Sequence, residues 1–95
     1  MPDMMIELRG FMGLFTLFKK RNWSNPYFII LEEEVTGPKL LERLDIPKKD
    51  VEIMFINGKA FLPFDAIICP GDRVALVPPG TPGPYRVLLG FIKQE

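Results

Sequence analysis

The sequence predicts a single α+β domain, a roll in which a mixed sheet of four to five strands wraps over one main helix. Strand-like and helix-like patterns follow one another in the order strand, short helix, strand, helix, strand, hairpin arm, strand. Asn57-Gly58 separates two apolar runs, as in a tight hairpin, and Thr36 precedes an amphipathic helical pattern. A chain of 95 residues can bury one hydrophobic core but not two.

The first elements alternate between strand and helix patterns. A strand is predicted at 4–9, because Ile6 and Leu8 alternate with charged residues, and Gly10 closes it. One to two helical turns are predicted within 11–21, since four apolar residues recur at helical spacing: Phe11, Leu14, Phe15 and Phe18. Basic residues at the end of this segment suit a helix C-terminus: Lys19, Lys20 and Arg21.

A loop at 22–26 leads to a second strand at 27–31, which we expect to extend into the acidic run 32–34. The main helix follows. Thr36 is a good N-cap, and Gly37 with Pro38 opens the first turn. A buried stripe is predicted for three leucines, and Pro47 stops the helix soon after them: Leu40, Leu41 and Leu44.

The last third of the chain is predicted to be β-rich. A strand at 51–56 runs into Asn57-Gly58, which favours a type I′ turn because both central residues of that turn need a positive φ. Residues 59–62 form the returning arm, 64–68 a short connection and 70–72 a turn. The apolar run 73–77 predicts a last, central strand.

Composition limits the function classes. Twelve basic and twelve acidic residues give a formal net charge of zero, which disfavours binding to nucleic acid or anionic lipid. The chain has no His, so His-dependent catalysis and His metal sites are excluded, and the single Cys69 is expected to be a small core residue. No apolar run suits a membrane helix and the N-terminus lacks a basic signal-peptide start, so a cytoplasmic, cofactor-free protein is expected.

Two motifs resemble those of a known family. The run VEIMFINGK at 51–59 and the run PGDRVALVPP at 70–79 are similar to the hairpin and last strand of the MoaD/ThiS group of ubiquitin-like β-grasp proteins. The resemblance covers about 5–83 and implies a ubiquitin-like β-grasp roll. In that family a small protein ends in Gly-Gly, and a partner enzyme adenylates its terminal carboxylate, which becomes a sulfur-donating thiocarboxylate. Molybdenum or tungsten cofactors and thiamine are typical destinations.

The sequence departs from this pattern at the carrier terminus. Gly83 lies about where the final glycine of the family would stand, but Pro82 precedes it and twelve residues follow. We therefore divide the chain into a ubiquitin-like domain at 1–83 and an apolar extension at 84–95. Apolar residues occupy both alternating faces of that extension, so we expect it to pack on the domain or in an interface, including a homodimer formed through 85–92.

The resemblance also suggests which residues meet a partner. Gly83 is the candidate carrier terminus, and four residues are candidates for docking an activating or synthase-type protein: Pro78, Pro79, Gly80 and Phe64. No catalytic, cofactor-binding or metal-binding residue is assigned, and we do not expect an enzyme. The exposed members of the aromatic set Trp23, Tyr27 and Phe64 suit an interface, but the sequence does not say which of them lies in the core.

Three alternative functions remain open from the sequence. The first is a MoaD/ThiS-like protein that acts through protein contacts, linked to molybdenum or tungsten cofactor assembly or another sulfur-transfer pathway. The second is a true sulfur carrier, activated after cleavage behind Gly83. The third is a β-grasp nucleic-acid-binding domain, for which the basic residues 19–21 beside Trp23 are the candidate contact.

Overall fold

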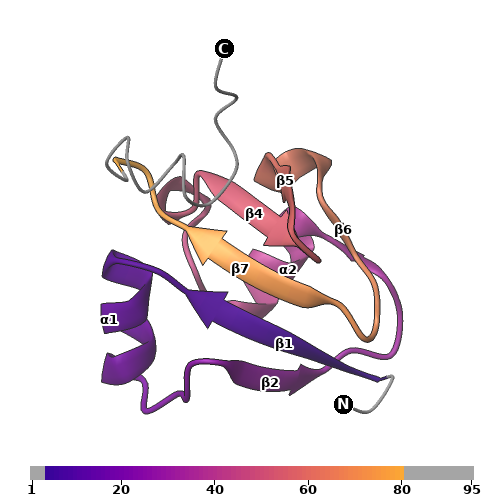
Figure 1. Cartoon of the computed structure of the whole chain (residues 1–95), viewed down its shortest axis with the longest axis horizontal. Helices are drawn as coiled ribbons and strands as arrows, with labels where there is room; N and C mark the ends of the chain where they lie inside the picture. The colour runs from indigo at the N-terminus through magenta and orange to yellow at the C-terminus, as the bar shows by residue number, and fades with distance from the viewer. Residues whose placement is uncertain (1–3, 81–95) are drawn as a thin grey trace.

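The computed structural model describes residues 4–80, which form a mixed sheet of five strands, a second sheet of two short strands, and two helices (Figure 1). The strands of the main sheet are β1 Met5–Gly10, β2 Tyr27–Ile30, β4 Ile53–Ile56, β5 Lys59–Phe61 and β7 Arg73–Val77. The helices are α1 Gly13–Lys20 and α2 Gly37–Leu44. Two 3-10 turns are η1 Lys48–Asp50 and η2 Pro63–Asp65. The predicted α+β roll is confirmed.

Strand pairing brings the first and last strands of the fold together. The order across the main sheet is β2-β1-β7-β4-β5, and β1 and β7 are parallel neighbours with Leu8 beside Val74. The other neighbouring strands are antiparallel: β1 with β2, β4 with β7, and β4 with β5. The predicted central position of 73–77 is therefore confirmed, because β7 lies between β1 and β4.

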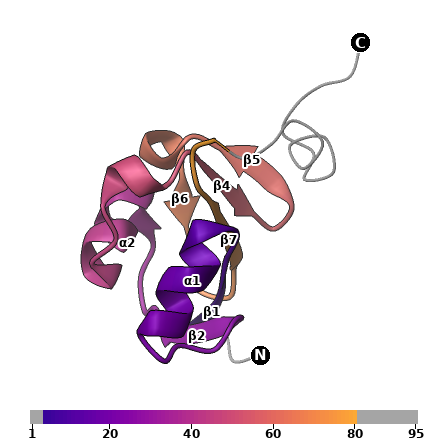
Figure 2. The same ribbon diagram turned by 90° about the vertical axis from the view of Figure 1, so that its left-hand side faces the viewer.

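Both helices contribute to one core on the same face of the sheet (Figure 2). Successive residues of a strand point to opposite faces, and in each central strand one alternating set is buried against the helices. This set consists of Ile6, Leu8, Val74, Leu76, Met54 and Ile56. The predicted stripe of α2, with Leu40, Leu41 and Leu44, packs against it and is confirmed.

The cap and turn predicted from short motifs are also confirmed. The Thr36 side chain accepts a hydrogen bond from the Lys39 backbone N–H at 3.3 Å, as an N-cap does. Asn57 and Gly58 have φ values of 51° and 88°, so both adopt the left-handed conformation that the hairpin requires. Asp45, with φ 55°, ends α2 in the same conformation.

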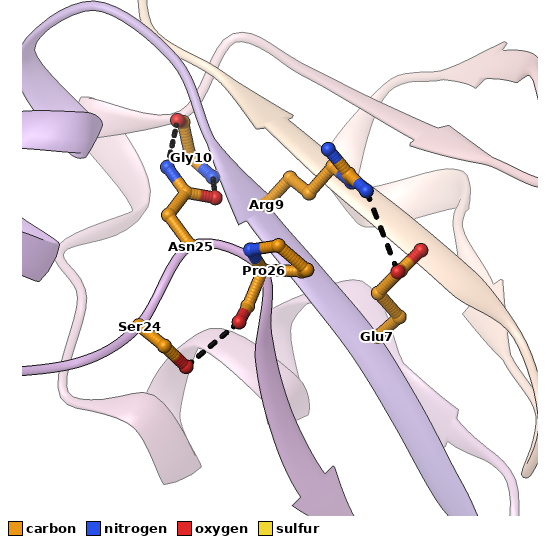
Figure 3. Close-up of polar contacts among 6 residues, drawn as sticks. All are labelled: Glu7, Arg9, Gly10, Ser24, Asn25 and Pro26. Atoms are coloured by element: carbon orange, nitrogen blue, oxygen red, sulfur yellow. Dashed lines mark hydrogen bonds and ion pairs between the residues drawn. The ribbon is translucent and has the colours of Figure 1, made fainter. Parts of the chain in front are cut away.

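Asn25 fixes the loop that precedes β2 to the end of β1. Its side-chain oxygen accepts a hydrogen bond from the Gly10 N–H at 3.3 Å, and its amide nitrogen donates to the Gly10 carbonyl at 2.8 Å (Figure 3). Ser24 Oγ donates to the Pro26 carbonyl at 2.7 Å, and the Asn25-Pro26 peptide bond is cis. These contacts hold β2 in position to pair with β1.

Two element predictions are wrong in part. Phe15 does not join the buried face of α1: it is 52% exposed, whereas Leu17 packs against the core beside Leu14 and Phe18. The second strand does not extend into 32–34, because β2 ends at Ile30 and the chain then leaves the sheet toward α2. Leu31 is buried at that departure, and its N–H donates to the Met4 carbonyl at 2.6 Å.

A small second sheet, which was not predicted from the sequence, lies beside α2. Within the described residues, β3 Val35–Thr36 pairs antiparallel with β6 Ile67–Ile68. This pair joins the start of α2 to the connection between β5 and β7. In residues 4–80 no helix has the length and apolar character needed to cross a membrane.

Candidate functional site

The predicted docking residues that follow β7 line a groove beside α1. Its lining includes Pro78 and Pro79 and, from α1, the buried Leu14 and the half-buried Leu17. The groove has a volume of about 510 Å³, and Lys20 and Lys49 also line it. It is a partly apolar groove that carries two cationic side chains and the Asp50 carboxylate, and it lies next to the residues that follow β7.

The other predicted residues of the site are not brought to this groove. Phe64 lies on η2, is 69% exposed and does not line the groove beside α1. Gly80 follows the groove and is exposed, with φ 79°. Gly83 and the extension 84–95 lie outside the described residues. Pro78 and Pro79 thus line the groove beside α1, whereas Phe64 lies in the connection between β5 and β6.

A second surface is the face of the main sheet that lies away from the helices, which we call the open face. On edge strand β2, Phe28 and Ile30 point to this face and are 44% and 65% exposed. Glu7 is the neighbour of both Phe28 on β2 and Arg73 on β7. The open face therefore combines exposed apolar side chains with charged side chains of both signs.

The charged residues surround a hollow on the open face. This hollow has a volume of about 340 Å³, and its lining includes Glu7, Arg9, Arg73 and Phe55. Arg9 and Glu7 form an ion pair of 3.5 Å between Nη2 and Oε1 (Figure 3). The Arg9 side chain is half exposed, so this contact contributes little to stability and leaves its guanidinium accessible to a partner.

The two motifs on which the family resemblance rests meet at one end of the sheet. Asn57, in the turn between β4 and β5, donates from Nδ2 to Asp72 Oδ1 at 2.9 Å. Asp72 Oδ2 in turn accepts from the Cys69 backbone N–H at 2.8 Å. The Arg73 N–H donates to Asn57 Oδ1 at 3.0 Å, and the Asn57 N–H donates to the Arg73 carbonyl at 2.9 Å. These hydrogen bonds connect the turn between β4 and β5 to the turn that precedes β7.

The sequence matches the family described as Mut7-C ubiquitin over residues 4–82. The chain belongs to the Mut7-C ubiquitin family. A search of curated proteins gave no match. With the five-stranded sheet formed by residues 4–80, this membership supports the predicted ubiquitin-like β-grasp fold. It supports a ubiquitin-like family without specifying the MoaD/ThiS group.

The contacts of the motif residues explain why these motifs indicate the fold of this Mut7-C ubiquitin domain and not a particular activity. Asn57, Gly58 and Asp72 serve the turns and the contact between them. Any β-grasp protein that needs this junction gains from the same residues, whatever its C-terminus does. The motif residues are therefore part of the scaffold, and the candidate site lies on the surfaces around them.

Two members of the basic-aromatic cluster, Arg21 and Trp23, make contacts within the fold, whereas Lys19 and Lys20 are exposed. Arg21 donates from Nη1 to the Leu44 carbonyl and from Nη2 to the Asp45 carbonyl, both at 2.6 Å, so it caps the C-terminus of α2. Its guanidinium also lies 4.8 Å from the Trp23 ring centroid. Trp23 stacks on Tyr27 at 4.6 Å and meets Phe18 edge-on at 5.2 Å.

These contacts answer which aromatic residues belong to the core. Trp23 and Tyr27 are half-buried and pack against the core cluster, whereas Phe64 is a surface residue. Trp23 stacks on Tyr27, and Arg21 donates to two carbonyls at the end of α2, so both side chains have a role within the fold.

The structure corrects the expectation for Cys69. Its side chain is exposed rather than part of the core, because the alternation of β6 buries Ile68 and the next residue begins the turn to β7. Within residues 4–80, no group of three or more His, Cys, Asp or Glu side chains is placed to hold a metal ion.

Sequence reasoning missed Phe28 and Ile30 as surface residues. All four residues of β2 are apolar, so the strand shows no alternation between apolar and polar side chains that would separate its two faces. Their exposure becomes visible only once the pairing with β1 is known.

Proposed function

We propose that this protein is a ubiquitin-like docking module that acts through contact with a partner protein and is not a catalyst in its own right. The observation that carries the proposal is the exposure of Phe28 and Ile30 on the open face, at 44% and 65%. Exposed aromatic and aliphatic side chains next to each other on an edge strand form the kind of patch that a partner covers.

The charges on the open face support the same function. Glu7 and Arg9 lie on β1, next to the strand of Phe28 and Ile30, and Arg73 lies on β7 beside Glu7; together they form a polar margin to the apolar patch. In protein interfaces such a margin sets orientation and the rate of association more than the affinity, which comes from the apolar centre. We assign the affinity to Phe28 and Ile30 and the orientation to the charged residues.

The family name gives the first partner to test. It joins the ubiquitin-like domain to a Mut7-C component, so we propose that a Mut7-C polypeptide is the docking partner. The resemblance of the hairpin and last strand to the MoaD/ThiS group suggests a second class of partner, an activating or synthase-type enzyme.

Calorimetric titration of the full chain with each partner class tests this function. We expect Ile30→Glu to weaken binding by about tenfold or more, because a charge would replace a central apolar contact. Phe15→Glu on α1 is the matched control, since Phe15 is exposed to a similar degree at 52% but lies on another surface. Phe64→Glu tests the surface that the sequence predicted. Equal affinity for the parent and Ile30→Glu proteins would contradict the open face as the docking surface.

A sulfur carrier is the second candidate function, with molybdenum or tungsten cofactor assembly as its destination. It is favoured by Pro79 and Gly80, which directly follow the last strand and are exposed, so the residues that precede a carrier tail are accessible to a partner enzyme. Carrier activity requires cleavage behind Gly83 to create a glycine carboxylate. The intact mass of the protein from its own cells tests this requirement: a mass ending at Gly83, alone or with one oxygen replaced by sulfur, supports a carrier, and a mass through Glu95 contradicts it.

A further inference from the structure

We propose that the segment 84–95 of this chain covers the patch of the open face formed by Ile53 and Phe55 of β4 and Ala75 and Val77 of β7. This inference goes beyond the proposed function, because it concerns a contact within one chain. It also divides the open face into two parts: one covered by the chain itself, and one, around Phe28 and Ile30 on β2, left for a partner.

The burial of two side chains on the open face is the first observation. Phe55 and Val77 are only 7% and 0% exposed, yet neither belongs to the core cluster under the helices. Their neighbours Met54 and Leu76 do belong to that cluster, so alternation along each strand directs Phe55 and Val77 to the opposite face. Side chains buried on that face need a cover other than the helices.

The patch to be covered is apolar and continuous. Val77 pairs with Ile53 across the β4–β7 ladder, and Phe55 pairs with Ala75 two positions along. Ile53 and Ala75 are half-buried. Four apolar side chains on two neighbouring strands thus form one patch that gains free energy when an apolar segment excludes water from it.

The chain that continues from Gly80 suits this patch in position and in length. Val77 is three residues before Gly80, whose φ of 79° turns the backbone as it leaves β7. An extended run of the eight residues 85–92 would span about 26 Å, more than the roughly 17 Å of the five-residue β7. A segment that returns after a turn can therefore lie along the whole patch.

The composition of the segment suits the patch as well. One alternating set consists of Tyr85, Val87, Leu89 and Phe91, which can present four large apolar side chains to one surface. The family match ends at residue 82, so this segment lies outside the part shared with other Mut7-C ubiquitin domains. Its apolar character fits a cover for this patch of β4 and β7.

Paramagnetic NMR on the full chain tests the proposal. A spin label is attached at Lys93→Cys in a Cys69→Ser background, because Cys69 is exposed and would otherwise also react. We expect a greater loss of amide signal intensity at Phe55 and Ala75 than at Leu41, which lies behind the sheet in α2. A label at Lys39→Cys, on the exposed side of α2, is the matched control and should reverse that order, with the greater loss at Leu41.

Intact signals at Phe55 and Ala75 with the label at position 93 would overturn the proposal. A second sample mixes spin-labelled, unenriched chains with unlabelled, isotope-enriched chains. Loss of intensity in that mixture would also overturn it, because the segment would then cover a second copy. No partner protein enters these measurements, so their failure is distinct from a failure of partner docking through Ile30.

A substitution series gives an independent measure of the same contact. Replacing Val87, Leu89 and Phe91 together by Ser should speed amide hydrogen exchange at Phe55 without changing it at Leu41. Gln94→Ser is the control and should change neither. Unchanged exchange at Phe55 in the triple variant would contradict the cover.

Discussion

Asn57 and Asp72 are 15 positions apart in the sequence, yet their side chains form one junction between two turns. Asn57 satisfies two demands: its φ of 51° suits the hairpin, and its amide both donates to Asp72 and accepts from the Arg73 N–H. Few residues combine tolerance of a positive φ with a side chain that is both donor and acceptor. The junction therefore explains why Asn stands at position 57.

Asn57→Gly should distinguish the contribution of the side-chain hydrogen bonds from that of the turn conformation. Glycine keeps the turn conformation and removes both side-chain hydrogen bonds, so we expect the free energy of unfolding to fall by about 1–2 kcal/mol. Asp72→Ala should cost a similar amount. Because they share one bond, the two changes combined should cost less than the sum of the single effects in a double-mutant cycle measured by urea denaturation.

Asp65→Ala provides the control for that cycle. Asp65 is an exposed carboxylate on η2, outside the junction, and its removal should change stability by less than about 0.5 kcal/mol. Strict additivity of Asn57→Gly and Asp72→Ala would show that the two side chains do not stabilise each other in solution.

Gly37 determines how closely η2 approaches the start of α2. A Cβ at this position would lie 1.9 Å from the Pro63 carbonyl oxygen and 2.8 Å from the carbonyl carbon, and both atoms belong to the backbone. The Gly37 N–H also donates to the Ala66 carbonyl at 2.9 Å. We expect Gly37→Ala to lower the free energy of unfolding by about 3 kcal/mol, because the helix and η2 must move apart. Chemical denaturation followed by circular dichroism measures this loss.

Gly13→Ala is the matched control on the other helix. A Cβ on Gly13 would meet no atom within 4 Å, and alanine favours the helical conformation. This variant should be neutral or more stable by up to about 1 kcal/mol. Equal losses at the two positions would mean that a general intolerance of substitution, rather than the contact with Pro63, accounts for the effect at Gly37.

The elements that the sequence predicted are those whose signals are local. The cap at Thr36 and the turn at Asn57-Gly58 depend on neighbouring residues, and both were predicted correctly. The β3–β6 pair was missed, because Val35 and Ile68 pair across a long stretch of chain with only two residues in each strand. Phe15 was wrongly predicted to be buried. Phe15 and Leu17 are both apolar, and only the orientation of α1 on the sheet determines which of them is buried.

The candidate site was predicted less completely, for the same reason. Pro78 and Pro79 follow the last strand directly, so a surface at the end of that strand was predictable from the sequence. The open face consists of residues from β1, β2, β4 and β7 that meet only through strand pairing. Its exposed apolar pair Phe28 and Ile30 has no sequence signal of its own within a strand that is apolar throughout.

Within residues 4–80, both helices and the main sheet share one core. Leucines of α2, Leu14 and Phe18 of α1, and the alternating residues of three strands belong to one cluster. Arg21 adds a polar link, because it extends from the end of α1 to the last carbonyls of α2. With a single core and this link, neither helix has a separate set of contacts that would keep it folded when the rest unfolds.

Unfolding should therefore be a single cooperative transition. Trp23, the one tryptophan of the chain, stacks on Tyr27 of β2 beside the end of α1, so its fluorescence reports on that corner of the molecule. Circular dichroism reports on all helices and strands, and the two transitions should coincide. Arg21→Ala should lower both midpoints together. The free energy of unfolding should fall by about 2 kcal/mol, because two hydrogen bonds from a charged donor are lost at a helix C-terminus. Arg43→Ala, on the exposed side of α2, is the control and should leave the midpoints nearly unchanged. A fluorescence midpoint that falls while the dichroism midpoint stays in place would mean that the Trp23 corner unfolds on its own, and the single shared core would then be contradicted.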